Sequence, residues 1–394
     1  MNVCHIGCGF HGWGGIARMV MDFFNHPQNA PFVYHLVTTS SSENFKRWAK
    51  NAGTKWFEPE RDQFILSRVR NISNYIKQNN IQIIHSYNAE AGIWALFSEL
   101  LIKKPLLLIA HEHGSMWYLR PNLRWLDFIA KKRSKYIIAN SRASVFLLQK
   151  LYNLPPQKIK LVYNFITVTK KYSREEARQR LGLTAEAEVV GSVGRLDTPK
   201  DYWTLIDAAR LVIPHRKKVN FVLIGGGPQE MFLKGLIQDY GLTEQFHLLG
   251  SRDDAPELIA GFDLFVSTSF RESFGNVLIE AALQEKAVIA PAVDGIPEAV
   301  EDGVTGVLLQ PSLRARRVRV KGATPMPKWV VLESSLHSPR SLDPKLLAET
   351  IIQLLDDPDK RNWMGVQGRA RAEKVFNIHR YISDLEKIYL ESFE

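Results

Sequence analysis

The sequence predicts an α/β protein with two doubly wound domains, each built on a parallel sheet. The chain has 394 residues, which is long for a single domain. Short apolar segments of strand length alternate with stretches of helical period, the pattern of a parallel sheet covered by helices on both faces. An apolar run followed by glycine and a helical stretch begins near residue 3 and again near residue 189. The pattern is therefore completed twice, which predicts two domains facing a cleft.

The first domain is expected over residues 1–167, and it opens with an apolar segment that runs into glycines from Gly7 onward. Helical period fills Gln63–Asn79. Buried strands are expected at Val33–Thr38, Ile81–His85, Leu106–His111 and Tyr136–Asn140. Two cysteines, Cys4 and Cys8, in a chain of this size favour a reducing compartment. The first residues lack the charged and apolar regions of a signal peptide, so a cytoplasmic location is expected.

The second domain is expected over residues 168–375, after a linker near residues 164–171. It begins with a charged helix at Ser173–Leu181, in which Ser173 and Glu176 have the spacing of a capping box. A further helix is expected at Tyr202–Val212. Strands are expected at Val189–Gly191, Phe221–Gly227, Phe246–Gly250, Leu264–Ser267 and Ala287–Ala290.

Two segments depart from this alternation. Residues 312–343 are rich in Arg, Lys, Pro and Ser, and they include the apolar run Trp329–Leu332, which suggests an inserted arm with a short hairpin. Three roles are open for this arm: closing over the cleft, binding an acceptor or partner, or forming an exposed insertion. Residues 376–394 have the apolar period of a helix, and we expect it to pack back on the N-terminal domain.

The net charge of the chain is +10, and the excess of cations is concentrated in one stretch. Residues 100–180 hold seventeen Lys and Arg against four Asp and Glu. A basic surface of this kind suits an acidic partner: anionic lipid, a phosphate-bearing acceptor or nucleic acid. No apolar run reaches the length of about 18 residues that a membrane-spanning helix needs, so no such helix is expected.

A phosphate-binding site is indicated by two cations that follow a predicted strand. Arg195 and Lys200 come after Gly194, at the carboxyl end of that strand, where open α/β sheets bind ligands. In a sugar nucleotide, negative charge grows on the diphosphate as the glycosidic bond breaks. Fixed cations at that point would be the main catalytic contribution. The alternative is a pair of solvated surface cations.

A pair of glutamates lies farther along the chain. Glu272 precedes a predicted helix and Glu280 lies within it, so both could serve one pocket if a loop carries the first. Gly275 lets the backbone approach a ligand closely, and the helix that follows offers free N–H groups at its start. Taken alone, two glutamates are a weak signal, because helix surfaces commonly carry them.

The order of these motifs resembles that of the family 4 retaining glycosyltransferases, which have the GT-B fold of two Rossmann-like domains. The resemblance rests on the Arg195–Lys200 loop and the Glu272–Glu280 pair, and it covers nearly the whole chain. Supporting stretches are Gly225–Pro228, Gly250–Asp254, Phe274-Gly275, Asp294–Glu298 and Gly14–Arg18.

The resemblance implies a role for each matching residue on the donor side. Arg195 and Lys200 would hold the donor diphosphate, Glu280 the ribose, and Glu272 the hydroxyls of the donor sugar. Arg252 would lie in the loop that frames the base. The remaining donor-binding residues implied are Gly14, Gly15, Ser273, Phe274, Gly275, Asn276 and Val277.

The resemblance also implies residues in the N-terminal domain. His111 would lie beside the reacting centre as a catalytic residue with Glu272, while His85 and His113 are acceptor-side candidates. His111 is favoured over His113 because it directly follows the predicted strand. The implied reaction moves a hexose from a UDP- or GDP-linked donor to a saccharide or lipid-linked acceptor. It retains anomeric configuration and needs no cofactor or metal.

Two alternatives account for less of the sequence: an NAD-dependent oxidoreductase and a zinc site. The run from Gly7 to Gly12 has the G-x-G-x-x-G spacing of an NAD-dependent oxidoreductase, but the second strand ends at Val37–Ser42 without the acid that binds the ribose. A zinc site at His11, His85, His111 and His113 lacks any recognised ligand spacing.

The basic N-terminal surface leaves two further readings. A nucleic-acid-binding module is suggested by the run Lys131–Lys135, but no nucleic-acid motif accompanies it, and no nucleic-acid partner is expected. Peripheral binding to an anionic membrane is suggested by Met116–Arg120 and Leu123–Ile129, where aromatic residues alternate with arginines. Equally open is the packing of Trp125, Leu126, Phe128 and Ile129 against the first sheet.

Overall fold

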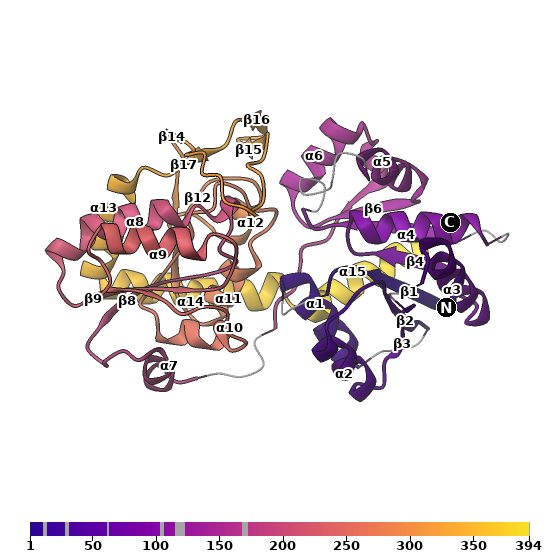
Figure 1. The fold of residues 1–394 in the computed structure, drawn as a ribbon, viewed down its shortest axis with the longest axis horizontal. Coiled ribbons are helices and arrows are strands. Elements are labelled where there is room, and N and C mark those ends of the chain that lie inside the picture. The colour runs from indigo at the N-terminus through magenta and orange to yellow at the C-terminus, as the bar shows by residue number, and fades with distance from the viewer. Residues whose placement is uncertain are drawn as a thin grey trace. The chain divides into compact units, whose positions relative to one another are not determined.

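The computed structural model describes residues 1–10, 14–27, 31–60, 63–102, 106–114, 123–167 and 172–393. The chain forms two compact units, shown in Figure 1. The first unit contains Met1–Phe165 and Ile378–Glu394, and the second contains Ile166–Asn377. The chain therefore leaves the first unit once and returns to it with its last helix.

The first unit is built on a seven-stranded parallel sheet in the order β3-β2-β1-β4-β5-β6-β7. The order reverses between β1 and β4, as the predicted doubly wound fold requires. The strands are β1 (Asn2–Gly7), β2 (Val33–Thr38), β3 (Lys55–Phe57), β4 (Ile83–Ser86), β5 (Leu107–Glu112), β6 (Tyr136–Ala139) and β7 (Ile159–Leu161).

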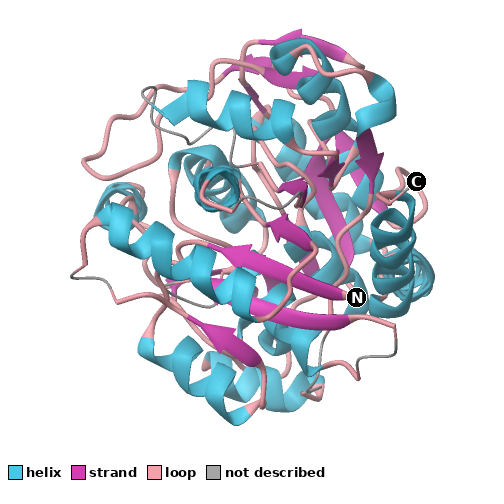
Figure 2. Ribbon diagram, turned by 90° about the vertical axis from the view of Figure 1, so that its right-hand side faces the viewer, coloured by secondary structure: helices cyan, strands magenta, loops and turns pink. Residues whose placement is uncertain are grey.

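Both faces of this sheet are apolar, because helices cover both (Figure 2). Val3 and Leu36 face a cluster that includes residues of helices α1 and α15. Their neighbours Cys4 and Val37 face a second cluster with residues of α3 and α4. The helices are α1 (Gly15–Asn25), α2 (Glu43–Asn51), α3 (Ile65–Gln78), α4 (Ala89–Leu100), α5 (Arg124–Arg133), α6 (Arg142–Tyr152) and α15 (Ile378–Glu391).

The last helix, α15, is part of the core of the first unit. Tyr381, Leu385 and Tyr389 are fully buried there. Polar contacts add to this packing: Tyr34 Oη donates to Glu386 at 3.3 Å, and Lys160 pairs with Glu391 at 2.8 Å. The C-terminal segment thus completes the fold of the first unit.

Helix α5 packs two charged side chains toward the core beside the buried Ala130. Asp127 and Lys131 are buried, and Lys131 Nζ lies 3.1 Å from the buried Glu112. By contrast, the side chains of Trp125, Phe128 and Ile129 are 60%, 42% and 41% exposed. The sheet-packing alternative is therefore wrong for these three residues, although Leu126 is half-buried. The Lys131–Lys135 run does not lie wholly on the surface, because Lys131 is buried.

The second unit has a six-stranded parallel sheet in the order β10-β9-β8-β11-β12-β13. The order again reverses once, between β8 and β11. Both units therefore confirm the prediction of two doubly wound parallel-sheet domains. The strands are β8 (Glu188–Val193), β9 (Val219–Ile224), β10 (Phe246–Leu248), β11 (Leu264–Val266), β12 (Ala287–Pro291) and β13 (Gly306–Leu309).

Helices cover both faces of the second sheet. Residues of α8, α9 and α13 form one large apolar cluster with the strands. On the first helix of the unit, α7, the Ser173 hydroxyl accepts from Glu176 N–H at 3.1 Å, which is the predicted N-cap. The helices are α7 (Arg174–Leu181), α8 (Tyr202–Val212), α9 (Glu230–Asp239), α10 (Ala255–Leu258), α11 (Asn276–Leu283), α12 (Ile296–Ala299), α13 (Pro344–Asp356) and α14 (Pro358–Val375).

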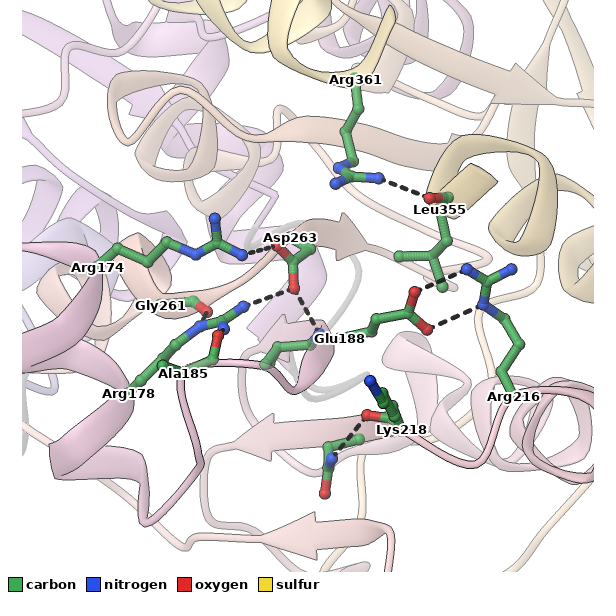
Figure 3. A network of polar contacts seen from close by, with 12 residues as sticks. Arg174, Arg178, Ala185, Glu188, Arg216, Lys218, Gly261, Asp263, Leu355 and Arg361 are labelled. Atoms are coloured by element: carbon green, nitrogen blue, oxygen red, sulfur yellow. Dashed lines mark hydrogen bonds and ion pairs between the residues drawn. The ribbon is translucent and has the colours of Figure 1, made fainter. Parts of the chain in front are cut away.

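A polar network holds the amino-terminal ends of strands β8 and β11 together (Figure 3). Asp263, which precedes β11, accepts from the backbone N–H of Val189 at 2.7 Å and pairs with Arg178 at 2.7 Å. Arg174 pairs with the other oxygen of the same carboxylate at 2.5 Å. The network lies at the strand ends opposite to those that carry Arg195 and Glu272, so its role is structural.

The arm over residues 312–343 forms two small antiparallel pairs in the second unit (Figure 1). Its base is closed by β14 (Leu313–Arg314) against β17 (Arg340–Ser341), and its hairpin joins β15 (Val330–Leu332) to β16 (Ser335–His337). Glu333 and Ser334 form the turn with φ values of 46° and 60°, as the favoured two-residue hairpin turn requires. Inside the arm, Ala315 is buried against Trp203 and Phe270.

Candidate active site

Three predicted donor-side residues of the second unit, Arg195, Lys200 and Glu272, lie where the strand order of its sheet reverses. Strands β8 and β11 are neighbours, but the chain continues from them to opposite sides of the sheet. Arg195 and Lys200 follow the carboxyl end of β8, and Glu272 follows that of β11. In open α/β sheets this is the position at which ligands bind.

Lys200 and Glu272 form an ion pair between these two loops. Their side chains are 22% and 19% exposed, so the pair is partly screened from water yet open to a ligand. The Thr268 hydroxyl also donates to the carbonyl of Lys200 at 2.9 Å. The structure thus places the predicted diphosphate-binding lysine against the predicted sugar-binding glutamate, although they are 72 residues apart in the chain.

Glycines allow the loop after β8 to contact the loop after β9 directly. A Cβ on Gly225 would lie 1.9 Å from the carbonyl oxygen of Gly194, and one on Gly227 would lie 2.4 Å from that of Leu196. Leu196 N–H donates to the carbonyl of Gly226 at 3.0 Å. Only glycine is compatible with this approach, and the contact fixes the backbone on which Arg195 is carried.

The carboxylate of Asp197, which sequence reasoning missed, is the centre of the loop after β8. It is buried, and it accepts from the backbone N–H of Thr198 at 2.8 Å and from that of Thr324 at 2.7 Å. The Thr324 hydroxyl donates to its second oxygen, which lies 3.2 Å from Arg195 Nε. Asp197 therefore connects Arg195 to the arm. Its position between the two predicted cations was the only sequence signal for it.

The carboxylate of Asp294 has the same kind of position beside Glu272. It accepts from Glu272 N–H at 3.1 Å and from Val331 N–H, in the arm, at 2.7 Å. Asp294 has a φ of 47°, in the left-handed region that is unfavourable for residues other than glycine. Burial raises its pKa to about 6, against the opposing effect of Arg271 at 3.8 Å. The Asp294–Glu298 motif is apparent in the sequence, whereas this role of Asp294 depends on the fold.

Helix α11 begins immediately after the Glu272 loop. Gly275 is its N-cap residue with a φ of 93°, and the first N–H groups of the helix lie at Asn276 and Val277. Glu280 is half-buried in the second turn. Ser273 is half-buried, whereas Phe274 is buried against Phe376 with ring centroids 5.4 Å apart. Phe274 therefore supports the loop through packing, and its side chain is not exposed to a ligand.

Arg252, predicted to frame the base, lies after β10 and is held by a neighbouring acid. Its guanidinium donates to both oxygens of Asp254, at 2.9 and 3.0 Å, and this pairing raises the pKa of the arginine. Tyr172 Oη donates to the same carboxylate at 3.4 Å. The side chain of Arg252 remains 32% exposed, so it is oriented but accessible.

The histidines of the first unit differ from their predicted positions. Strand β5 extends to Glu112, so His111 lies within the strand and it is His113 that follows it. His111 is 2% exposed, whereas His113 is half-buried and stacks on it with ring centroids 3.9 Å apart. Burial holds the pKa of His111 well below its usual value and lowers that of His113 to about 4. The reason for favouring His111 over His113 is therefore wrong.

His85 is not exposed to any ligand. Its side chain is 0% exposed, Nδ1 lies 2.5 Å from Tyr389 Oη, and Nε2 lies 3.1 Å from His111 Nδ1. The expectation that His85 contacts an acceptor is corrected: one ring nitrogen contacts α15 through Tyr389, and the other contacts the neighbouring strand β5 through His111.

The glycines predicted to border the donor phosphates lie at the start of α1. Gly14 is its N-cap and Gly15 its first residue, and both are exposed. Two positions of the G-x-G-x-x-G run, His11 and Gly12, lie outside the described residues, as do Met116–Arg120. Among the residues that the structure describes, no group of three or more His, Cys, Asp or Glu side chains is arranged to hold a metal ion. No described helix is long and apolar enough to span a membrane.

Two family models match the chain, one for each half. The model described as Glycosyltransferase Family 4 matches residues 13–170, and the one described as Glycosyl transferases group 1 matches residues 173–319. N-acetyl-alpha-D-glucosaminyl L-malate synthase of Bacillus anthracis is 24% identical over 340 residues, which are 84% of this chain and 80% of that protein. A D-inositol 3-phosphate glycosyltransferase of Mycobacterium sp. (strain KMS) is 33% identical over 183 residues, 44% of this chain and 40% of that one.

Solved structures share the fold over the whole chain. Anabaena HepE in complex with UDP and glucose superimposes with a TM-score of 0.81 at 21% identity, covering 99% of this chain and 100% of that one. Sucrose-phosphate synthase from Thermosynechococcus elongatus superimposes with a TM-score of 0.77 at 19% identity, covering 100% and 99%.

Proposed function

Since this chain belongs to the family 4 glycosyltransferases and has their GT-B fold, we propose that it transfers a hexose from a nucleoside-diphosphate sugar to a saccharide or lipid-linked acceptor. We propose further that the reaction retains the anomeric configuration and that it needs no metal. It places the reaction in the assembly of a polysaccharide or glycoconjugate.

The observation that carries the proposal is the Lys200–Glu272 ion pair at the reversal point of the second sheet. A diphosphate and a sugar are bonded to each other in the donor, so their ligands must be adjacent. A cation for the first and a carboxylate for the second meet this requirement. Arg195 lies on the same loop as Lys200, and its side chain is 67% exposed and so available to a phosphate.

The proposed reaction breaks the bond between the anomeric carbon and the β-phosphate oxygen of the donor. A hydroxyl of the acceptor forms the new bond to that carbon on the same face, and its proton passes to the leaving diphosphate. Negative charge that develops on the diphosphate is stabilised by Arg195, Lys200 and the first N–H groups of α11. Glu272 orients the sugar hydroxyls and Glu280 the ribose.

Of the two candidate histidines, we propose that His113 is the one beside the reacting centre. It follows β5 and is the more exposed of the stacked pair, whereas His111 lies within the strand. With a pKa of about 4, His113 is neutral at pH 7, so it would present an uncharged ring to the sugar. His111 supports its ring by stacking.

For the donor, UDP-sugars are the first to test and GDP-sugars the second, because the solved structures of Anabaena HepE contain UDP. The proposal is tested by incubating the protein with a panel of UDP- and GDP-sugars without acceptor and measuring the release of the nucleotide. Arg195→Ala and Lys200→Ala should each abolish most turnover, while Lys218→Ala, an exposed cation on the same unit, should not. Near-normal turnover in both site variants would exclude this donor site, and EDTA should leave the rate unchanged.

We also propose that the first unit binds peripherally to an anionic membrane through α5. The support is the outward aromatic face at Trp125, Phe128 and Ile129, with exposed Arg124 and Lys132 on the same helix. Apolar side chains flanked by cations suit the interface of anionic lipids. Exposed apolar side chains on a helix that buries two charged ones are otherwise unfavourable in water.

Flotation with vesicles containing phosphatidylserine tests this surface. Serine at Trp125, Phe128 and Ile129 should abolish flotation, whereas serine at Phe64 and Leu66, which are 87% and 80% exposed on the same unit, should not. Binding should weaken as salt is added. If the unmodified protein does not float even at low salt, the membrane proposal fails.

A further inference from the structure

The arm lines an open cavity that no part of the proposed donor site uses. The cavity has a volume of about 500 Å³, and its walls come from arm residues between Arg317 and Pro339 together with Thr198 from the loop after β8. Small-molecule sites in proteins commonly have volumes of about 300–1,000 Å³. The cavity is therefore large enough for a monosaccharide with one charged group.

Three cations line this cavity: Arg317, Arg319 and Lys328. All three are exposed, and none lies in an ion pair with any described acid. The other lining side chains are uncharged, Val318 and Met326 among them. The lining carries three positive charges and no carboxylate, which favours the binding of an anion. Because a guanidinium can donate two parallel hydrogen bonds, the two arginines favour an anion with several oxygens.

The cavity has fixed walls because the arm is attached to the core at three places. Thr324, which also lines the cavity, donates its backbone N–H to Asp197 at 2.7 Å. Val331 N–H donates to Asp294 at 2.7 Å, and Ala315 is buried against Trp203. A ligand would therefore meet cations carried on an ordered backbone, which lowers the entropic cost of binding.

We propose that this cavity is a second anion-binding site, which takes the phosphate group of a sugar phosphate or of a phosphate-bearing acceptor. A phosphate monoester carries a charge near −2 at pH 7, which matches three cations better than the single charge of a carboxylate. None of the three cations of this site belongs to the loop that carries Arg195 and Lys200. It adjoins that loop through Thr198, which neighbours Asp197 and thereby Arg195.

Binding of glucose 1-phosphate, measured by calorimetry on the full chain, tests the site without any turnover. The background is Arg195→Ala with Lys200→Ala, which removes the cations proposed for the donor. In that background, serine at Arg317, Arg319 and Lys328 should weaken binding by about tenfold or more, because charge-assisted hydrogen bonds to phosphate are lost. Serine at Arg314, Lys321 and Arg340 is the matched control: it removes three exposed arm cations that do not line the cavity. This control should change the affinity little.

Three outcomes would overturn the inference. Equal weakening by the cavity variant and the control would mean that only the overall charge of the arm matters. Loss of all binding in the Arg195→Ala, Lys200→Ala background would place the sugar phosphate at the donor loop. That result would support the proposed function while excluding the second site. Glucuronate binding as tightly as glucose 1-phosphate would exclude the preference for phosphate. Circular dichroism and thermal unfolding verify that each variant is folded.

Discussion

Thr324 donates its backbone N–H to the carboxylate of Asp197 at 2.7 Å, across 127 residues of sequence. The same carboxylate lies 3.2 Å from Arg195 Nε, so an arm residue fixes the acid that orients a proposed phosphate-binding cation. Asp294 repeats this arrangement between Val331 and Glu272. The arm is thereby joined to both loops that carry the proposed donor site.

Asp197→Asn should raise the KM for the donor more than it lowers kcat. The amide cannot accept all of the hydrogen bonds that the carboxylate receives, and the ion pair with Arg195 is lost. An increase of about tenfold is expected for one charge-assisted contact. Steady-state donor hydrolysis measures it. Thr324→Val, which removes only the hydroxyl and keeps the backbone donor, should have a smaller effect in the same direction.

Glu272→Gln should lower kcat by about a hundredfold if the carboxylate holds the donor sugar in the transition state. The amide keeps the size of the side chain but loses the charge that pairs with Lys200. Binding of free UDP, which lacks the sugar, should be nearly unchanged when measured by calorimetry. A large loss of UDP affinity with normal kcat would instead place Glu272 beside the nucleotide.

The contribution of Asp294 to the free energy of unfolding should fall as pH rises from about 4 to about 6. Buried His111 and His113, whose pKa values are lowered, contribute in the opposite direction over the same range. The native state raises the pKa of Asp294 from 3.8 to about 6, so between these values the native protein holds a proton that the unfolded chain releases. The contribution is on the order of 3 kcal/mol, fully present below pH 4 and lost above pH 6. The difference in the free energy of unfolding between the unmodified protein and Asp294→Asn, from urea unfolding at pH 4, 5, 6 and 7, measures it.

Asp294→Asn should remove part of that pH dependence. Asp201, buried and with its pKa raised to about 7, acts in the same direction, so Asp201→Asn is the matched comparison. Asp201→Asn should leave intact the part of the pH dependence that comes from Asp294, which titrates near pH 6. An identical pH profile for Asp294→Asn and the unmodified protein would contradict this assignment.

His113→Ala should lower donor turnover by about a hundredfold, and His111→Ala should lower the free energy of unfolding as well as turnover. The first side chain is half-buried after β5, whereas the second is buried within it and bonded to His85. Thermal unfolding separates the two effects. Normal turnover in His113→Ala would return the catalytic assignment to His111.

Asp263→Asn should destabilise the second unit without changing its site. The substitution removes a buried charge that pairs with Arg174 and Arg178, and breaking such a pair costs about 3–5 kcal/mol. Chemical unfolding measures the loss, and UDP affinity below the unfolding transition should be unchanged. Glu285→Gln, which removes an exposed partner of Arg369, is the control and should cost less than about 1 kcal/mol.

The predicted bounds of strands and helices agree with the structure where the apolar period is strong. Val33–Thr38 and Tyr202–Val212 have the predicted bounds. The short strands β3, β7 and β13 were not predicted. One strand end mattered: β5 pairs with β6 as far as Glu112, so the strand ends there instead of at His111, and His113 is the residue that follows it.

The succession of apolar segments and helical stretches along the chain is enough to predict two doubly wound sheets and the residues that follow their strands. Alternation of apolar segments, glycines and caps arises from backbone hydrogen bonding and burial, which act over a few residues. The inward charged side chains of α5, the burial of His85 under α15, and the attachment of the arm through Asp197 and Asp294 involve partners far apart in sequence. Such contacts depend on how loops without any period meet in space, and the folded chain alone establishes them.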